Sequence, residues 1–394
     1  MTTLDFIASE PFTLGVELEL QLLDQHSLDL VDGIIPLLEI YPDNLYIKPE
    51  FIQNTVEIAT RICKNATEVE ADLQRIALGL RENALQMGMR LCGAGTHPFC
   101  QRQATITPLP RYQMMEREGG YISHNQITYA THVHVGMASG EDAIYVMRHL
   151  KSFLPLLIAV SANSPYWRGC ESDFASYRHR ILSASRSYGI PPSFESWQQF
   201  DEFFATVSQA GVFNHIRDIH WDIRPCPYYG TVEVRVMDAQ TTIAEAASLA
   251  ALVHVLAVYL LRQRETSWSA ACTVPALPWW LEKENHYQAT RLGIGANFVY
   301  SPLGEVKPLR TVWLELCRDL MAVAAELGEA DYLEQLNRRV IGNGIGYIRQ
   351  RDIFQGAGSL FDVVAALVGQ FDHGLETILT DCQGSLVMPK GSRR

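Results

Sequence analysis

Four short segments of the chain alternate apolar and polar residues with the period of a β-strand. Residues 14–20 place Leu14, Val16 and two further leucines on one face, and Glu17 and Glu19 on the other. The same alternation occurs at residues 55–58, 131–135 and 231–236. The pattern predicts four strands, each with one apolar face and one face that carries charged or imidazole side chains.

The polar faces of these strands have an unusual composition. They carry Glu17, Glu19, Glu57, His132, His134, Glu233 and Arg235. A solvated sheet face usually carries Thr, Ser, Lys and Gln instead. Crowded carboxylates repel one another unless a cation lies between them. One such strand alone would most simply be a solvent-facing edge, but the four together predict a polar sheet face that binds divalent metal.

The remaining pattern predicts helices between and after the strands. Helical spacing of apolar residues extends over about 67–89, and two more apolar helices are expected at about 142–162 and 246–261. A further strand ends in residues 93–98. After an irregular segment at 164–192, strands at 220–224 and 229–238 are expected to form a hairpin that turns through 225–228. Strands and helices without a regular βαβ repeat predict an α+β fold with a mixed or antiparallel sheet.

Length, charge and cysteine usage narrow the class of protein. No linker or repeat divides the 394 residues, so we expect a single domain over 1–394, sheet-rich at about 10–240 and mostly helical at about 241–394. A net charge of −12 argues against nucleic acid as a partner. The apolar run at 246–261 is shorter than a membrane span needs. Eight scattered cysteines and a polar N-terminus predict reduced thiols in the cytoplasm.

The types of ligand indicate the metal and the reaction. Oxygen ligands with one imidazole suit Mg²⁺ or Mn²⁺ better than a structural zinc site. Spacing leaves open whether His132 or His134 is the imidazole ligand. Arg235 shares a strand face with Glu233, so it is either a phosphate-binding residue or a structural partner of Glu233. A cation and guanidinium pair would serve ATP-dependent phosphoryl transfer.

Other candidate binding residues have weaker patterns. Arg178, Arg180 and Arg186 lie in the irregular segment, where they would contact phosphate or a substrate carboxylate, or remain surface charges. Thr96 and His97 are further candidates, although loop structure explains His97 as well. The chain has no Walker motif, and its glycine-rich residues 342–346 are predicted to form a turn.

Several motifs in consistent order resemble the type 2 glutamate–cysteine ligase family of ATP-dependent carboxylate-amine ligases, which is related in fold to glutamine synthetase. The motifs lie at 15–19, 93–98, 131–136, 161–167, 176–178, 222–225 and 230–235. The resemblance therefore spans most of the chain. It implies a curved, largely antiparallel sheet that forms a funnel-shaped site for ATP and Mg²⁺ (or Mn²⁺).

The resemblance also implies roles for individual residues and a reaction. The implied metal ligands are Glu17, Glu19, Glu50, Glu57, His132 and Glu233. Arg235 is implied to bind phosphate, and Arg235, Glu57 and Glu233 are the candidate catalytic residues. In the implied reaction a substrate carboxylate attacks the γ-phosphorus of ATP, and an amine captures the acyl phosphate to form an amide. Glutamate and cysteine are the substrates for which the family is named.

Two positions depart from the family pattern. Leu18 stands where family members often have an acid, but strand parity turns Leu18 away from the two neighbouring glutamates. Residues 172–175 also differ from the usual pattern, so the identity of the substrates stays open.

Two other functions fit the same residues. A metal-dependent hydrolase would use the carboxylates and the two histidines to activate water. A sensor would bind nucleotide or an amino acid without turnover, although so many retained acids argue against that. We expect amino-acid substrates and ATP as partners, leave a homo-oligomer open, and expect residues 119–120 or 164–192 to close over the site.

Overall fold

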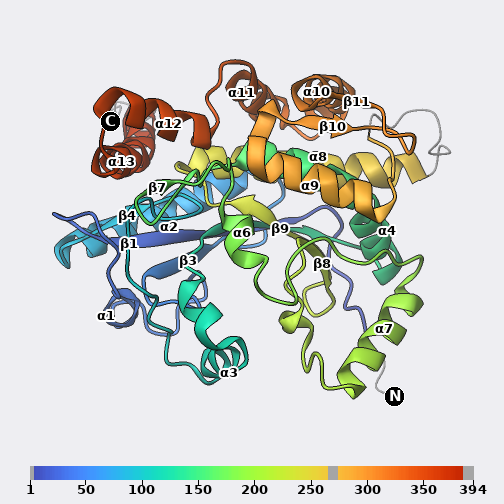
Figure 1. The fold of residues 1–394 in the computed structure, drawn as a ribbon, viewed down its shortest axis with the longest axis horizontal. Helices are drawn as coiled ribbons and strands as arrows, with labels where there is room; N and C mark the ends of the chain where they lie inside the picture. The colour runs from blue at the N-terminus through green and yellow to red at the C-terminus, as the bar shows by residue number, and fades with distance from the viewer. Residues whose placement is uncertain (1–3, 265–273, 385–394) are drawn as a thin grey trace, which may run out of the picture.

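A seven-stranded sheet forms the centre of the molecule (Figure 1). The computed structural model describes residues 4–264 and 274–384. The strand order is β2-β3-β1-β5-β9-β8, with β4 paired to β1, and every pairing is antiparallel. The strands are β1 (Leu14–Asp24), β2 (Ile47–Pro49), β3 (Thr55–Ala59), β4 (Met89–Cys92), β5 (Ala130–Gly136), β8 (Ile223–Cys226) and β9 (Thr231–Asp238). This open antiparallel sheet among helices confirms the predicted α+β fold.

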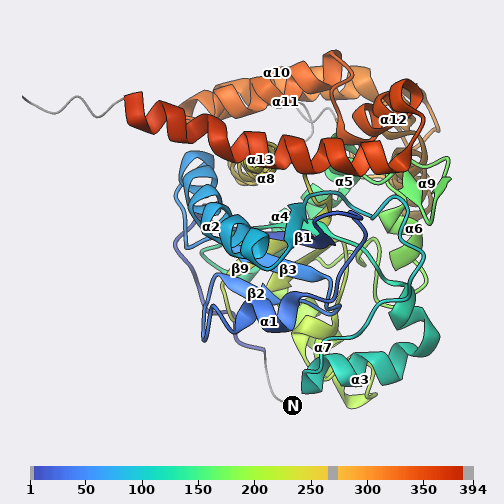
Figure 2. The ribbon, with the colours of Figure 1, turned by 90° about the vertical axis from the view of Figure 1, so that its left-hand side faces the viewer.

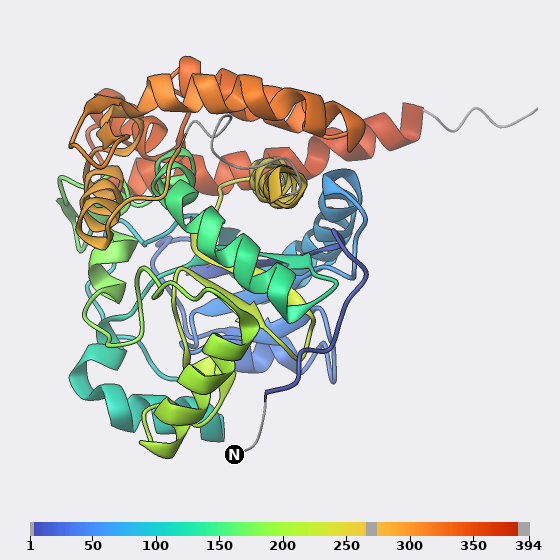
Figure 3. The ribbon, with the colours of Figure 1, turned by 90° about the vertical axis from the view of Figure 1, so that its right-hand side faces the viewer.

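Helices cover the apolar face of the sheet. Helices in contact with its central strands include α2 (Ala66–Gln86), α4 (Gly140–Leu150), α5 (Leu154–Ser161) and α8 (Ile243–Arg264). Figure 2 shows α2 and α8 on this side, and Figure 3 shows the succession of α4 and α5 from the opposite direction. The alternate residues of β1 that were predicted to be apolar, such as Leu18 and Leu20, are fully buried against these helices. The opposite face of β1 carries Glu17 and Glu19.

The C-terminal third forms a further helical layer beyond α8 (Figure 1). Its helices are α9 (Trp279–Leu292), α10 (Leu309–Glu326), α11 (Ala330–Ile341), α12 (Gly346–Ala357) and α13 (Leu360–Gly384), with a small hairpin of β10 (Asn297–Val299) and β11 (Val306–Pro308). The remaining α-helices of the described residues are α1 (Ile34–Leu38), α3 (Pro110–Gly119), α6 (Arg178–Leu182) and α7 (Trp197–Gln209).

Two apolar helical stretches are long enough to cross a membrane by composition, Gly140–Ser161 and Ile243–Arg264. Inside the fold, 83% and 94% of their apolar windows are buried, respectively. Packing against the sheet and the C-terminal layer therefore accounts for their apolar character.

Three local expectations from the sequence were wrong. The helix expected at 142–162 is interrupted by a 3₁₀ turn at Lys151–Phe153, because Pro155 in the first turn of α5 has no N–H and disfavours helix before it. Pro225 and Cys226 belong to β8, so the hairpin turns through 227–230; β8 is the last strand of the sheet, where proline is tolerated. The segment at 164–192 contains α6 and a small hairpin of β6 (Tyr166–Trp167) and β7 (Cys170–Glu171).

Candidate active site

The strand register places the predicted polar residues opposite one another. The cross-strand pairs are Glu19 with Glu57, Glu17 with His132, and His134 with Glu233. Directly opposite residues lie on the same face, with β-carbons about 4.5–5.5 Å apart. The polar faces of β3, β1, β5 and β9 therefore combine into one continuous surface.

A β-bulge lies at the middle of this surface. The register between β5 and β9 shifts between Thr131 and Val133, so that Arg235 and Val236 of β9 stand against the single residue His132. Bulges bend a strand and redirect side chains, and they are common beside active sites. This bulge accompanies the close approach of His132 to Glu233, with 3.9 Å between Nδ1 and Oε1.

The polar surface forms one wall of a cavity of about 440 Å³. Every predicted metal ligand lines this cavity: Glu17, Glu19, Glu50, Glu57, His132 and Glu233. Arg178 and Arg235 line it as well. The structure therefore brings together carboxylates, an imidazole and guanidinium groups from segments between residues 17 and 235.

Glu17, His132 and Glu233 form one group of candidate ligands, with one donor atom of each within 4.8 Å of the others. Glu17 Oε2 lies 3.4 Å from His132 Nδ1. Burial opposes ionisation of Glu17, but hydrogen bonds to His132 and His134 hold its pKa well below the usual value. Burial and the charge of Arg235 lower the pKa of His132 to about 4, so its imidazole is neutral and able to bind a metal.

Glu19, Glu50 and Glu57 form a second group, again with donor atoms within 4.8 Å of one another. Burial raises the pKa of Glu19 to about 7; the charge of Arg178 opposes this rise, and the charge of Glu57 adds to it. Burial and the charge of Glu19 raise the pKa of Glu50 to about 7, and burial with Glu17 and Glu50 raises that of Glu57 well above its usual value. One buried and two half-buried acids that resist ionisation together are a fitting site for a divalent cation.

Guanidinium groups complete the wall beside these acids. Arg235 pairs with Glu233 Oε1, and Arg224 Nε lies 2.7 Å from Glu233 Oε2. Burial opposes ionisation of Glu233, but Arg224 and Arg235 hold its pKa well below the usual value. The Nε atoms of Arg178 and Arg235 are buried and have no hydrogen-bond partner among the described residues. Unpaired buried donors are costly, and an anionic ligand such as a phosphate would satisfy them.

The structure does not bring Thr96, His97 or Arg186 into this cavity. Thr96 Oγ1 donates to the carbonyl of Tyr166 at 2.8 Å, and His97 Nε2 donates to the carbonyl of Leu28 at 2.9 Å. Both side chains are buried, and burial lowers the pKa of His97 to about 4. Arg186 is exposed and donates to the carbonyl of Val212. Arg180 lies outside the cavity too, over the ring of Tyr287.

Close packing explains the glycine-rich motif at 93–98. A β-carbon on Gly95 would lie 2.6 Å from the carboxyl carbon of Asp238. Asp238 in turn accepts hydrogen bonds from the amide of Asn163 and the hydroxyls of Ser164 and Ser176. Three of the family-like motifs therefore meet at Asp238, where they support the end of β9.

Several residues of the cavity wall were not among the candidates predicted from the sequence. Lys48 Nζ lies 3.1 Å from Glu57 Oε1 and 3.7 Å from Glu17 Oε1, so it stands between the two acidic groups. Arg224 and Cys226 share the polar face of β8, and period-2 parity from Ile223 was the signal that could have found them. Arg111, Arg217 and Tyr188 come from loops and short helices, for which no periodic signal exists.

A comparison with known protein families identifies the chain. The sequence model of the family described as "Glutamate-cysteine ligase family 2" matches residues 13–365. The chain belongs to this family. It is accordingly an ATP-dependent carboxylate-amine ligase, an enzyme that forms a carbon–nitrogen bond.

Two relatives match over nearly their whole length. A protein of Trichormus variabilis is 46% identical over 375 residues, covering 95% of this chain and 96% of that protein. A protein of Gloeobacter violaceus is 35% identical over 370 residues, covering 93% and 98%. Both are named "Putative glutamate–cysteine ligase 2".

Solved structures show the same fold at low sequence identity. The glutamate–cysteine ligase of Francisella tularensis, in complex with AMP, has a TM-score of 0.64 at 15% identity and covers 98% of this chain and 97% of that one. The ligase PafA, in complex with the ubiquitin-like protein Pup, has a TM-score of 0.51 at 12% identity and covers 96% and 77%. These similarities establish a ligase fold of the glutamine synthetase type.

Proposed function

We propose that this ligase joins the γ-carboxylate of glutamate to the amine of cysteine in the cytoplasm, with residues 1–394 acting as one catalytic unit. The observation that carries the proposal is the shared wall of carboxylates and guanidinium groups in one cavity. The names of two relatives that match over nearly the full chain support the choice of substrates.

Mg²⁺ or Mn²⁺ fits the two acidic groups of this wall. Each group offers carboxylate oxygens, and one adds the neutral imidazole of His132, which is a donor set for hard divalent cations. The bound ions would neutralise the phosphates of ATP. Glu17, His132 and Glu233 would bind one ion, and Glu19, Glu50 and Glu57 the other.

The protein's own residues would position the reacting groups. Arg235 and Arg178 would donate their unpaired Nε–H groups to the phosphoryl group that is transferred. A carboxylate oxygen of the acid attacks the γ-phosphorus and ADP leaves; the amine then attacks the acyl carbon and phosphate leaves. Positioning and charge neutralisation supply most of the catalysis in such transfers.

ADP release from MgATP tests the proposal directly. The purified chain would be assayed with glutamate alone, with glutamate and cysteine, and with a panel of other acids and amines, and the products identified by mass. We expect pair-dependent ADP release with γ-glutamylcysteine as product. Another amide would replace the proposed substrates, and the absence of ADP with every pair would refute the proposal.

A matched pair of variants tests the metal site. Glu19→Gln removes one acidic ligand at nearly constant volume and should lower kcat/KM by at least about 100-fold, with a parallel loss of Mn²⁺ binding. Arg186→Gln changes an exposed residue outside the cavity and should act like the unmodified enzyme. Turnover near the unmodified rate in Glu19→Gln would contradict the assignment of Glu19.

A further inference from the structure

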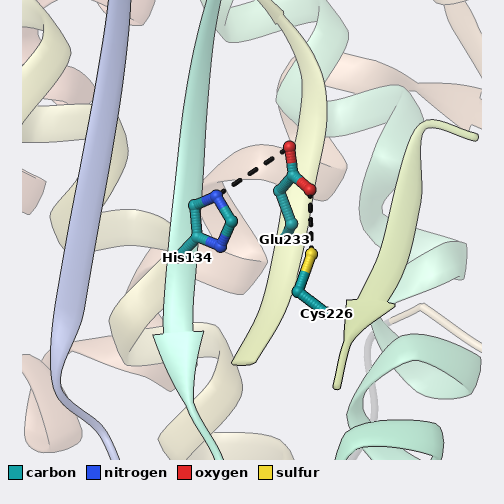
Figure 4. Close-up of side chains that lie close together, drawn as sticks. All are labelled: His134, Cys226 and Glu233. Carbon is teal, nitrogen blue, oxygen red and sulfur yellow. Dashed lines mark hydrogen bonds and ion pairs between the residues drawn. The ribbon is translucent and has the colours of Figure 1, made fainter. Parts of the chain in front are cut away.

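A third group of donor atoms lies beside the acidic groups and has a different chemistry. It consists of His134 on β5, Cys226 on β8 and Glu233 on β9, which converge from three adjacent strands (Figure 4). Cys226 Sγ lies 3.0 Å from Glu233 Oε2, and His134 Nε2 lies 3.9 Å from Glu233 Oε1. One donor atom of each residue lies within 4.8 Å of the others. Among the cysteines whose side chains the structure describes, Cys226 is the one that lines the cavity.

A neighbouring hydroxyl fixes the orientation of His134. Thr231 Oγ1 and His134 Nδ1 are 2.9 Å apart, so Nδ1 is engaged and Nε2 faces Glu233. Such a partner on the second ring nitrogen is the usual support of a metal-binding histidine. The ring is further packed edge-on against Tyr229, with centroids 6.1 Å apart. His134 is therefore pre-oriented as a ligand, with Nε2 near Glu233 and 3.9 Å from Glu17 Oε2.

We propose that His134, Cys226 and Glu233 form a separate subsite for a borderline-soft divalent cation such as Zn²⁺ or Co²⁺. Sulfur, imidazole nitrogen and one carboxylate oxygen are the donor set that such ions prefer, whereas Mg²⁺ prefers oxygen alone. His134, Cys226 and Glu233 all line the cavity, so an ion held by these three residues would keep a further position available to water or a ligand. Burial opposes the charge of His134, but the carboxylate of Glu233 raises its pKa well above the usual value. The ion therefore displaces one proton from the His134 imidazolium and one from the Cys226 thiol, and both protons are released to solvent.

The donor atoms that accompany Glu233 favour a softer metal ion. Arg224 and Arg235 each contact one carboxylate oxygen of Glu233, so the donors that distinguish this subsite are the sulfur of Cys226 and the imidazole nitrogen of His134. A thiolate and an imidazole bind a softer ion more strongly than they bind a hard one. The subsite therefore distinguishes between metals by donor type rather than by charge.

Glu233 belongs both to this subsite and to the group with Glu17 and His132. A Zn²⁺ ion on Cys226 and His134 would draw the Glu233 carboxylate away from that group and inhibit the ligase. This consequence, unlike the subsite itself, rests on the proposed function.

Absorption spectroscopy of the full chain with Co²⁺ tests the subsite without turnover. A thiolate bound to Co²⁺ gives a near-ultraviolet charge-transfer band, which we expect to saturate at one ion per chain. Cys226→Ser should abolish the band, and Cys170→Ser, which changes an exposed cysteine of β7, should leave it intact. Thr231→Val should weaken Co²⁺ binding by about 10–100-fold, because it removes the partner of Nδ1.

The wild-type measurement alone is able to overturn the inference. Absence of the band in the folded wild-type chain would refute the subsite, and so would its persistence in Cys226→Ser. ADP release with Mg²⁺ is measured separately, so that the two proposals are tested independently. An active ligase without the band refutes only the subsite. A band in a protein without ligase activity refutes only the proposed function. If the protein is an active ligase, Zn²⁺ should also inhibit it. With the rate of each protein normalised to its rate without Zn²⁺, inhibition of wild type should be at least tenfold stronger than inhibition of Cys226→Ser.

Discussion

Lys48 shows how a single residue sets the charge balance of the active site. Its ammonium group lies between the two acidic groups, close to Glu57 and to Glu17. Burial opposes its charge, but the two carboxylates raise the pKa of Lys48 above the usual value. The protein thus supplies one permanent cation of its own where divalent cations are proposed to bind.

Removing this cation should strengthen metal binding. In Lys48→Met the ammonium group no longer competes for the oxygens of Glu57 and Glu17, so we expect Mn²⁺ affinity to rise by about tenfold, or about 1.4 kcal/mol. Equilibrium dialysis with Mn²⁺ measures this change. Lys307→Met, which removes an ion pair between Lys307 of β11 and Glu315 of α10, serves as control. Equal or weaker binding in Lys48→Met would show that Lys48 supports the metal ligands instead.

At the scale of elements, Asp222 connects the edge strand β8 with helix α9. Its Oδ2 lies 2.9 Å from His286 Nε2, and its carbonyl accepts the amide N–H of Arg235 at 2.8 Å. The side chains of Asp222 and His286 are both buried. Burial opposes ionisation of Asp222, but His286 holds its pKa below the usual value. The family-like motif at 222–225 therefore begins with a residue that positions β9 and its arginine.

The Asp222 interaction should give stability a defined pH dependence. A carboxyl whose pKa is lower in the folded state stabilises the fold above its unfolded pKa of about 3.9, and this contribution is lost as the pH falls through the folded value. Asp222→Asn should cost about 3–5 kcal/mol of unfolding free energy at pH 7. The difference from wild type should shrink below about pH 4. Urea unfolding at both pH values measures it.

A solvent-exposed pair provides the control for Asp222. Glu171 and Arg351 form an ion pair near the surface, and Glu171→Gln should cost less than about 1 kcal/mol. A cost for Asp222→Asn that is equally small, or that does not change with pH, would contradict the role given to Asp222.

At the scale of the whole molecule, one buried carboxylate joins three helices of different layers. Glu329 precedes α11, and its Oε1 accepts the N–H of Ala66 at the start of α2 at 2.8 Å. Both of its oxygens lie 3.0 Å from His254 Nδ1 in α8. Glu329 is fully buried. The C-terminal layer is thereby connected to the helices that cover the sheet.

Loss of this carboxylate should lower the stability of the fold without changing the active site. Glu329→Gln removes a buried charged acceptor of three hydrogen bonds and should lower the unfolding free energy by about 3–5 kcal/mol, while KM for ATP stays close to that of wild type. Glu326→Gln breaks an exposed ion pair with Arg262 and should cost less than about 1 kcal/mol. Similar thermal unfolding of the two variants would contradict the connecting role of Glu329.

Local patterns in the sequence determined which faces of the strands are polar and which metals suit them. Period-2 alternation places Glu17 with Glu19 and Glu233 with Arg235 whatever the strands pair with, because it follows from backbone geometry alone. The donor types likewise indicate hard divalent cations without knowledge of the fold. The motifs in order were enough to indicate the ligase family before any contact was known.

Only the tertiary structure decided which of these residues meet. Register between distant strands sets Glu17 against His132, places Lys48 between the acidic groups, and brings Cys226 to Glu233. Thr96 and His97 have suitable chemistry, yet packing turns them to backbone partners away from the cavity. The physical reason is that strand pairing and burial depend on the free energy of the whole packed chain, whereas side-chain alternation depends on each residue's own backbone.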